Sequence, residues 1–252
     1  MTYCVGMSLE SGLVMLSDSR TNAGIDHINT FRKMVWFEEP DDRVLVLMSA
    51  GNLAITQSLM NLLKENLYSE NPQLSILKAP NLFEVARSIG ESLREIHRRD
   101  GNALRDFNID FASSFILGGQ IKGEAPRLFN IYSAGNFIEA SEETPFFQIG
   151  EIKYGKPIVD RVVKRSTSLL EAAKCALISM DSTIRSNLSV GLPLDLLVIR
   201  RDDFKVTCHT SIDQDDDYFN LLRSSWGNSL REAFQQLPNP SWLDCNINNC
   251  AS

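Results

Sequence analysis

The first fifty residues alternate between short apolar segments and clusters of turn residues, a pattern typical of β-strands. Four apolar-rich segments cover residues 3–9, 13–18, 34–38 and 44–49. The sequences Glu-Ser-Gly at 10–12 and Glu-Pro-Asp-Asp at 39–42 separate the members of each pair. Because these residue types favour tight turns, the pattern predicts two hairpins, and therefore four strands at the start of the chain.

The apolar spacing changes after Gly51 to steps of three and four residues, which is the period of an amphipathic helix. Asn52 can cap this helix at its N-terminus. A second helical stripe follows Asn81, where Glu84 three residues later completes a capping box. Gly101 is a residue type that commonly ends a helix, so we expect the second helix to stop just before it.

The remaining chain repeats this order of strands and then helices. Strands are expected at 110–118, 127–133, near 137 and at 146–149, and later at 194–200 and 204–210. Two helices lie between these groups, one with Pro157 in its first turn and one capped by Ser168 and Glu171. An acidic cluster at 215–217 favours the start of one last helix. Runs of strands and runs of helices predict an α+β fold with two antiparallel sheets face to face and helix pairs outside.

The composition narrows the class of protein. The 252 residues carry 25 Lys and Arg against 32 Asp and Glu, so the formal net charge is −7, which argues against nucleic acid as the main partner. No apolar run is long enough for a transmembrane helix, and the N-terminus lacks the basic region of a secretory signal. The five cysteines form no Cys-x-x-Cys pair, and the three histidines are scattered. We therefore expect a reduced, cytoplasmic protein without a disulfide framework, a metal site or an organic cofactor.

Thr2 is the first candidate for chemistry. Cytoplasmic processing generally removes an initiator methionine before a small residue, so removal of Met1 would leave Thr2 with a free α-amine beside its own hydroxyl. An α-amine has a pKa of about 7.7–8.0, which leaves a useful neutral fraction at physiological pH. Such an amine can take the proton of the hydroxyl and make one residue both nucleophile and base.

Asp18 and Lys33 add charge near this position. Asp18 ends the second predicted strand, which the hairpin pairs with the strand that begins at Thr2, and Lys33 precedes the third. A lysine ammonium favours deprotonation of a neighbouring amine and hydroxyl, and a carboxylate would hold that lysine charged. Spacing alone leaves open the alternative of a surface ion pair worth about 0–1 kcal/mol.

These residues form a recognisable series. Thr2, the segment Leu-Ser-Asp-Ser-Arg-Thr-Asn-Ala-Gly at 16–24, Lys33 and the segment Ser-Ala-Gly at 49–51 resemble, in order and spacing, the active-site segments of proteasome-type β subunits. The segments at 31–34, 49–54 and 186–196 are similar, more narrowly, to Anbu, the ancestral β-subunit type found in bacteria. The resemblance spans most of residues 2–211.

The resemblance implies an N-terminal nucleophile hydrolase with a four-layer αββα sandwich over 1–211, followed by a helical extension and tail over 212–252. It implies a threonine-type peptidase or amidohydrolase that acts on a peptide or related amide and assembles into a homo-oligomeric ring or open helical turn. The residues matched to the family's roles are Thr2 as nucleophile, Asp18 and Lys33 as charged supports, Gly51 as oxyanion donor, and Thr21 and Ser49 in the substrate pocket.

The chain departs from the family's pattern at two supporting positions. Glu151 follows Gly150 where the family has a serine that helps to position the terminal amine. Ser189 matches the family's later serine, but Ser186 stands where an aspartate is expected, and Asp181 is the nearest acid upstream. These departures motivate an alternative, a catalytically weak or inactive assembly subunit.

A third hypothesis comes from residues 150–157, which match Gly-x-x-x-x-Gly-Lys between a predicted strand and helix. A phosphate-binding loop of this type needs a Ser or Thr after the lysine, to hold Mg²⁺. Pro157 supplies neither that hydroxyl nor a backbone N–H. A strand-to-helix turn with proline in the first helical turn explains the segment without a nucleotide.

Overall fold

The structure, a computed structural model, describes residues 2–22, 28–71, 74–240 and 242. The chain divides into two compact units, residues 1–214 and residues 215–252. The cysteines at 245 and 250 and most of the expected C-terminal tail lie outside the described residues.

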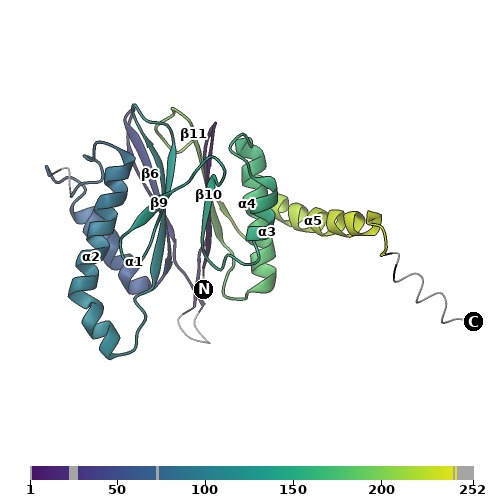
Figure 1. Cartoon of the computed structure of the whole chain (residues 1–252), viewed down its shortest axis with the longest axis horizontal. Coiled ribbons are helices and arrows are strands. Elements are labelled where there is room, and N and C mark those ends of the chain that lie inside the picture. The colour runs from purple at the N-terminus through teal and green to yellow at the C-terminus, as the bar shows by residue number, and fades with distance from the viewer. Residues whose placement is uncertain (1, 23–27, 72–73, 241, 243–252) are drawn as a thin grey trace, which may run out of the picture. The chain divides into compact units, whose positions relative to one another are not determined.

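The first unit consists of four layers (Figure 1). One sheet has the strand order β10-β1-β2-β11-β12 and the other β5-β6-β7-β8-β9, and every described pairing in them is antiparallel. Helices α1 and α2 cover the outer face of the second sheet, and α3 and α4 cover the outer face of the first. The predicted αββα sandwich is therefore confirmed.

The strands are short to medium in length. Their bounds are β1 Tyr3–Leu9, β2 Gly12–Asp18, β3 Arg20–Asn22, β4 Ile28–Thr30, β5 Met34–Glu39, β6 Arg43–Gly51, β7 Ser113–Ile121, β8 Arg127–Ile131, β9 Phe137–Glu139, β10 Phe146–Gly150, β11 Leu194–Arg200 and β12 Cys208–Ile212. The helices are α1 Leu53–Glu65, α2 Leu82–Asp106, α3 Lys156–Val162, α4 Leu169–Ser186 and α5 Asp217–Gln236.

Alternation of side chains gives each sheet one face toward the other sheet. Cys4 and Met15 of the first sheet meet Met48 and Ile116 of the second in one buried apolar cluster. A larger cluster joins the opposite face of the second sheet to α1 and α2. Burial of apolar surface at about 25 cal/mol per Å² is the main stabilising contribution of such layers.

Local capping explains where the helices begin. The Asn52 side chain accepts hydrogen bonds from the backbone N–H groups of Ala54 and Ile55, at 3.0 and 3.4 Å. Ser168 and Glu171 form the complete reciprocal capping box at the start of α4. Both helix starts match the positions that their capping residues predicted.

Four local expectations were wrong. The Asn81 side chain accepts a hydrogen bond from Glu84 N–H, but the Glu84 carboxylate pairs with Arg87 and does not complete the predicted capping box. The second helix continues through Gly101 to Asp106, and a Cβ at Gly101 would press on the ring of His97, which explains a glycine inside the helix. The short pair β3–β4 was not expected, so six strands rather than four precede α1. The last strand starts at Cys208 instead of residue 204, because Asp202 and Phe204 have φ values of 66° and 50°, which strand residues do not adopt.

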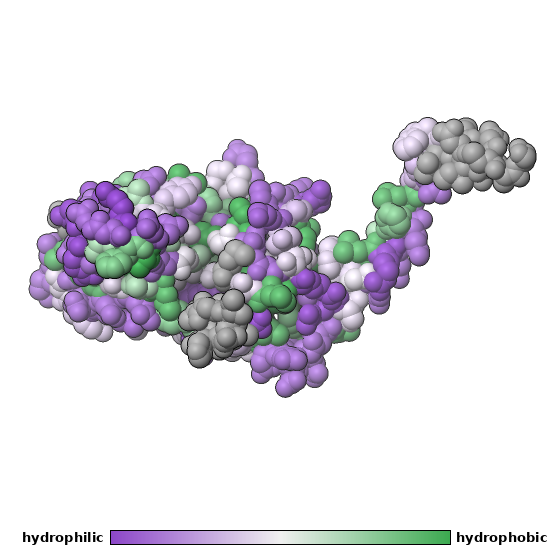
Figure 2. Space-filling model, turned by 90° about the horizontal axis from the view of Figure 1, so that it is seen from below, coloured by the Kyte–Doolittle hydropathy of each residue, from purple (hydrophilic) through white to green (hydrophobic). Residues whose placement is uncertain are grey.

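The second unit contains α5. The Asp216 side chain caps this helix by accepting a hydrogen bond from the N–H of Phe219 at 2.7 Å. Exposed apolar side chains of the unit are Tyr218, Leu221, Leu230, Phe234, Leu237 and Trp242. Figure 2 shows hydrophobic residues beside hydrophilic ones along this part of the chain. Within the described residues, no helix combines the length and the apolar character that a membrane span requires.

Tyr3 fixes the start of β1 to the helical layer. Its hydroxyl lies 3.1 Å from Ser179 Oγ in α4 and accepts a hydrogen bond from Gln148 in β10. Burial raises the pKa of Tyr3 to about 12. The neutral phenol therefore anchors the residue next to Thr2 from the side opposite the inter-sheet core.

Replacement of this phenol should lower stability in a pH-dependent way. We expect Tyr3→Phe to lower the free energy of unfolding by about 1 kcal/mol at pH 8, the usual value of a lost hydrogen bond. Because the folded pKa lies above the ordinary value of 10.0, the contribution of Tyr3 is complete below pH 10 and is lost as the pH rises toward 12. Urea unfolding at pH 8 and 10.5 should show the difference between the two proteins becoming smaller at the higher pH. Tyr68→Phe, at an exposed position, provides the control. If the difference in free energy of unfolding between the wild type and Tyr3→Phe were the same at both pH values, the anchoring role would be contradicted.

Candidate active site

Thr2 immediately precedes β1, which lies between strands β10 and β2. Its carbonyl oxygen accepts a hydrogen bond from Glu151 N–H at 2.7 Å, and the following N–H, of Tyr3, donates to Asp18 Oδ1 at 3.1 Å. Side chains two residues apart on a strand share a face, so Thr2 faces the inter-sheet space with Cys4. The residue is 9% exposed.

Asp18 and Lys33 form a buried ion pair beside this position. Lys33 Nζ lies 2.6 Å from Asp18 Oδ1 and also donates to the Arg20 carbonyl at 2.7 Å. The Lys33 and Asp18 side chains are only 4% and 0% exposed. The structure therefore brings together the two charges that the sequence predicted near Thr2, and the pair is not the solvent-exposed bridge of the alternative interpretation.

The Asp18 carboxylate is held by more than the lysine. Oδ1 accepts from Tyr3 N–H, and Oδ2 accepts from Gly191 N–H at 3.4 Å. Burial raises the pKa of this carboxyl above its ordinary value, and the Lys33 ammonium with the two N–H groups opposes that shift. Each of these contacts ties a different chain segment to the end of β2.

Gly51 ends β6 with a φ of 108°, a conformation that favours glycine. A Cβ at this position would collide with the carbonyl oxygen of Ala112. Asn52 N–H donates to that carbonyl at 2.9 Å, on the β7 side of the strand. Because N–H groups alternate in direction along a strand, the Gly51 N–H points to the other side, beyond the first residue of β5.

An open groove passes over this glycine. Its lining includes Ala50 and Gly51 from β6, Ser113 from β7, Ser133 after β8 and Gly150 from β10. Gly150 pairs with Tyr3 in the first sheet, and a Cβ on Gly150 would collide with the Thr2 carbonyl. The groove therefore lies between the end of β6 at Gly51 and the end of β10 at Gly150, the residue next to which Thr2 is held.

Glu151 and Asn187 lie on the β10 side of Thr2. Glu151 is 7% exposed, and its Oε2 accepts a hydrogen bond from Asn187 Nδ2 at 3.0 Å. The Asn187 side-chain oxygen accepts in turn from Ser189 N–H at 2.9 Å, which shapes the segment that leads to Gly191. Glu151 is the departure from the family's serine described above, and Asn187 was not among the predicted site residues.

The other predicted residues lie in the same unit. Asp181 is in α4, and its carboxylate pairs with Arg185 Nε at 2.9 Å. Thr21 is in β3, where its backbone pairs with Asn29. Ser49 is in β6, and its N–H and hydroxyl both donate to the Lys33 carbonyl, at 3.0 and 3.4 Å. The roles expected of Asp181, Ser189, Thr21 and Ser49 remain predictions.

The segment 150–157, which matches the pattern of a phosphate-binding loop, makes packing and ion-pair contacts within the fold. Lys156 Nζ pairs with Asp160 at 2.8 Å, one turn along α3, and Gly155 lies against the Tyr3 ring. The segment therefore packs against β1 through its glycines. No group of three or more metal-ligating side chains gathers among the residues that the structure describes.

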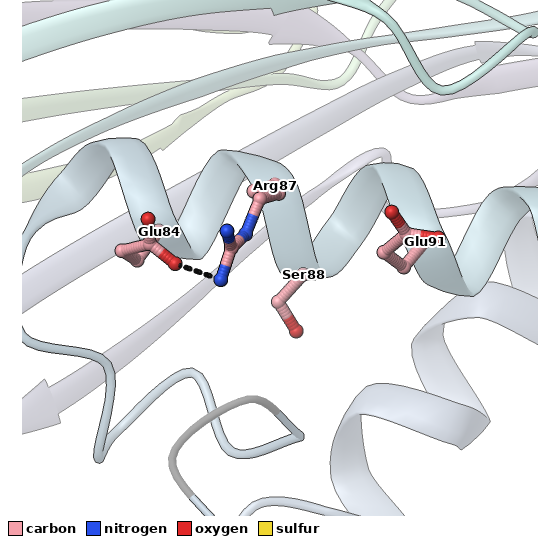
Figure 3. A pocket seen from close by; sticks show the side chains of 4 residues that line it. All are labelled: Glu84, Arg87, Ser88 and Glu91. Carbon is pink, nitrogen blue, oxygen red and sulfur yellow. Dashed lines mark ion pairs between the residues drawn. The ribbon is translucent and has the colours of Figure 1, made fainter.

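A separate pocket lies on α2 and has a different character. Figure 3 shows Glu84, Arg87, Ser88 and Glu91 around it, all from this one helix. Glu84 and Arg87 pair with each other at 2.5 Å. Glu91 pairs in turn with Arg94 at 2.7 Å, so both carboxylates beside the Ser88 hydroxyl are bound to arginines. This pocket therefore differs from the strand end of Thr2, where a lysine is the cation.

Comparison with known proteins agrees with this geometry. Anbu (ancestral beta-subunit) from Yersinia bercovieri is 51% identical, with a TM-score of 0.88 over 95% of this chain and 98% of that one. Anbu from Pseudomonas aeruginosa, solved as a helical assembly of the Anbu complex, is 49% identical, with a TM-score of 0.89 over 94% of this chain and 98% of that one.

The chain belongs to the Anbu family. A proteasome subunit beta from Haloquadratum walsbyi is more distant, at 25% identity over 213 residues, 84% of this chain and 79% of that protein. No family model matches the chain. The predicted resemblance to Anbu is therefore confirmed. The fold of this chain is the sandwich fold of the proteasome-type N-terminal nucleophile hydrolases.

The buried pair should be strongly coupled in stability. Lys33→Met and Asp18→Asn each leave one buried group without its charged partner, and we expect each to cost about 3 to 5 kcal/mol. The double variant should cost clearly less than the sum, as measured by urea unfolding in a double-mutant cycle. Lys156→Met, which breaks a half-exposed pair, should cost less than about 1 kcal/mol. Additive losses in the double variant would show that Lys33 and Asp18 do not act as a unit.

Proposed function

We propose that this chain is a threonine-type peptidase or amidohydrolase whose nucleophile is Thr2 after removal of Met1. The observation that carries the proposal is the position of Thr2, whose neighbour Tyr3 donates its N–H to the Asp18 carboxylate of the buried ion pair and whose carbonyl lies against Gly150 at the groove over Gly51. This arrangement supplies a nucleophile, a nearby cation and a backbone donor at one strand end. Such a site needs no metal or organic cofactor.

The reaction follows from these groups. The Thr2 hydroxyl oxygen adds to the amide carbonyl while its proton passes to the α-amine of the same residue. The Gly51 N–H stabilises the tetrahedral oxyanion, a role whose loss typically costs about 10²–10³-fold in rate. The protonated amine then delivers its proton to the leaving nitrogen, the C–N bond breaks and an ester to Thr2 remains. Water, activated by the amine, hydrolyses that ester and regenerates the hydroxyl.

Lys33 supports this chemistry electrostatically. A buried ammonium favours the neutral form of a nearby amine and stabilises negative charge that develops on the hydroxyl oxygen. Asp18 keeps the ammonium in place, because the ion pair is almost completely removed from solvent. Asp18 also binds Tyr3 N–H, so the same carboxylate orients the lysine and the backbone next to the nucleophile.

A threonine-directed β-lactone tests the nucleophile directly. Intact mass should show that the purified protein lacks Met1 and gains one lactone adduct, and peptide mapping should place the adduct on Thr2. Thr2→Ala should abolish the adduct, whereas the control Thr144→Ala, at an exposed position, should react as the wild type does. Retention of Met1, or unchanged acylation of Thr2→Ala, would contradict the mechanism.

The alternative is an assembly subunit with little or no turnover. Glu151 in place of the serine that the family resemblance implies favours this alternative. It predicts a chain that loses Met1 yet forms no lactone adduct at any pH, so the same experiment separates the two functions.

The proposed enzyme is a cytoplasmic homo-oligomer. Two observations support self-association: the relative from Pseudomonas aeruginosa was solved as a helical assembly, and Phe107, Ile109 and Leu53 are exposed apolar residues near the ends of α1 and α2. Light scattering after size exclusion should therefore give a mass that is a multiple of 28.3 kDa. A monomer at micromolar concentration would contradict this part of the proposal.

A further inference from the structure

The backbone of Thr2 turns its polar groups toward β10. Glu151 N–H donates to the Thr2 carbonyl, whereas the next N–H, of Tyr3, points the other way to Asp18. In an extended strand, the nitrogen and the carbonyl of one residue point to the same side. The α-amino nitrogen of Thr2 therefore lies on the Glu151 side of β1, and the Asp18–Lys33 pair lies on the opposite side.

The segment 187–193 closes the end of this strand. Asn187 contacts the Glu151 carboxylate next to β10, and Gly191 N–H contacts Asp18 at the end of β2. Between them, the Leu188 carbonyl accepts a hydrogen bond from Arg20 Nη1 at 2.9 Å. Because β1 lies between β10 and β2, this segment crosses the end of the strand from which the amine would project.

The two carboxylates on either side of Thr2, Asp18 and Glu151, differ in how closely a cation approaches them. Asp18 is matched by Lys33 at 2.6 Å, with Arg20 beside Gly191 on the same side. The Glu151 carboxylate accepts a hydrogen bond from the neutral Asn187 amide at 3.0 Å, and its one cationic partner among the described residues is Lys153, at 3.9 Å. The Lys153 side chain is 77% exposed, so solvent screens its charge. A buried carboxylate with one strong neutral donor has the capacity to accept another donor, preferably a cation.

We propose that Glu151, held by Asn187, is a positioning residue that accepts a hydrogen bond from the α-amino group of processed Thr2. The inference rests on the proposed function and adds the group that orients its base. Glu151 fixes the amine so that its lone pair, once neutral, can be directed at the Thr2 hydroxyl. The charge of Glu151 also sets a balance with Lys33, since the carboxylate favours the ammonium form and the lysine favours the neutral amine.

Competitive labelling with trace isotopic acetic anhydride tests the contact without requiring catalysis. The pH dependence of acetylation of the Thr2 α-amine gives its titration midpoint in the wild type and in Glu151→Gln, with loss of Met1 verified by intact mass. Removal of the neighbouring negative charge should lower that midpoint by about 1 pH unit. Glu143→Gln removes an equal charge from an exposed loop position and should leave the midpoint unchanged.

Lactone acylation provides the second readout. In Glu151→Gln, the acid limb of the rate profile should move to lower pH together with the amine, while the maximal rate falls about tenfold because the amine is held less well. Asn187→Ala keeps the charge but frees the carboxylate, so it should lower the maximal rate with a smaller shift of the limb. A purely structural role would lower the rate of both variants equally at every pH.

The two readouts separate the possible failures. A Thr2 amine that titrates identically in wild type and Glu151→Gln, in protein that the lactone acylates, would overturn this inference and leave the proposed function standing. A midpoint that shifts in protein that the lactone never acylates would support the contact and overturn the proposed function. Retention of Met1 would overturn both.

Discussion

The Asp18 carboxylate is the interaction on which the site depends, because it joins chain segments that no local pattern would bring together. It binds Lys33 ahead of β5, Tyr3 N–H at the start of β1 and Gly191 N–H ahead of β11. A buried carboxylate is costly unless such partners compensate it. The requirement for compensation therefore fixes the positions of the three segments around Thr2, and the sandwich supplies the dry surroundings in which these contacts are strong.

The two sheets contribute different residues to this site. Thr2 immediately precedes β1 and Asp18 ends β2 in the first sheet, whereas Lys33 immediately precedes β5 and Gly51 ends β6 in the second. Ser49 links the last two through its hydrogen bonds to the Lys33 carbonyl. A shift of one sheet over the other would separate Lys33 and the Gly51 backbone from Thr2, so the packing of Cys4, Met48 and their apolar neighbours is a condition of the site's geometry.

Much of this arrangement could be predicted because the signals are local. Hairpin turns, capping residues and apolar period placed most strands and helix starts, and the position of a threonine after the initiator methionine pointed to the candidate nucleophile. Gly101 was misread because a helix-ending residue type is compatible with a helix interior where a neighbouring ring, here His97, occupies the space of a side chain. The start of the last strand was missed because the positive φ of Phe204 is not encoded in its residue type. Asn187 was missed as a site residue because its side-chain contact with Glu151 spans 36 residues of the chain. Its position at the C-terminal end of α4 indicates only where the helix stops.

Glu151 departs from the family pattern, and its surroundings in the structure suggest a role different from that of the serine it replaces. Read as a substitution, it suggests a lost function, because a carboxylate cannot reproduce a hydroxyl that donates a hydrogen bond. Read within this structure, the same residue is buried, held by an amide and located on the side of β1 toward which the Thr2 nitrogen points. In the proposed mechanism, the terminal amine of Thr2 would lie between the anion of Glu151 on one side and the compensated cation of Lys33 on the other. The two charges would then jointly determine how much neutral amine exists at a given pH, and such a site would gain orientation of the amine at the expense of its basic form near neutrality.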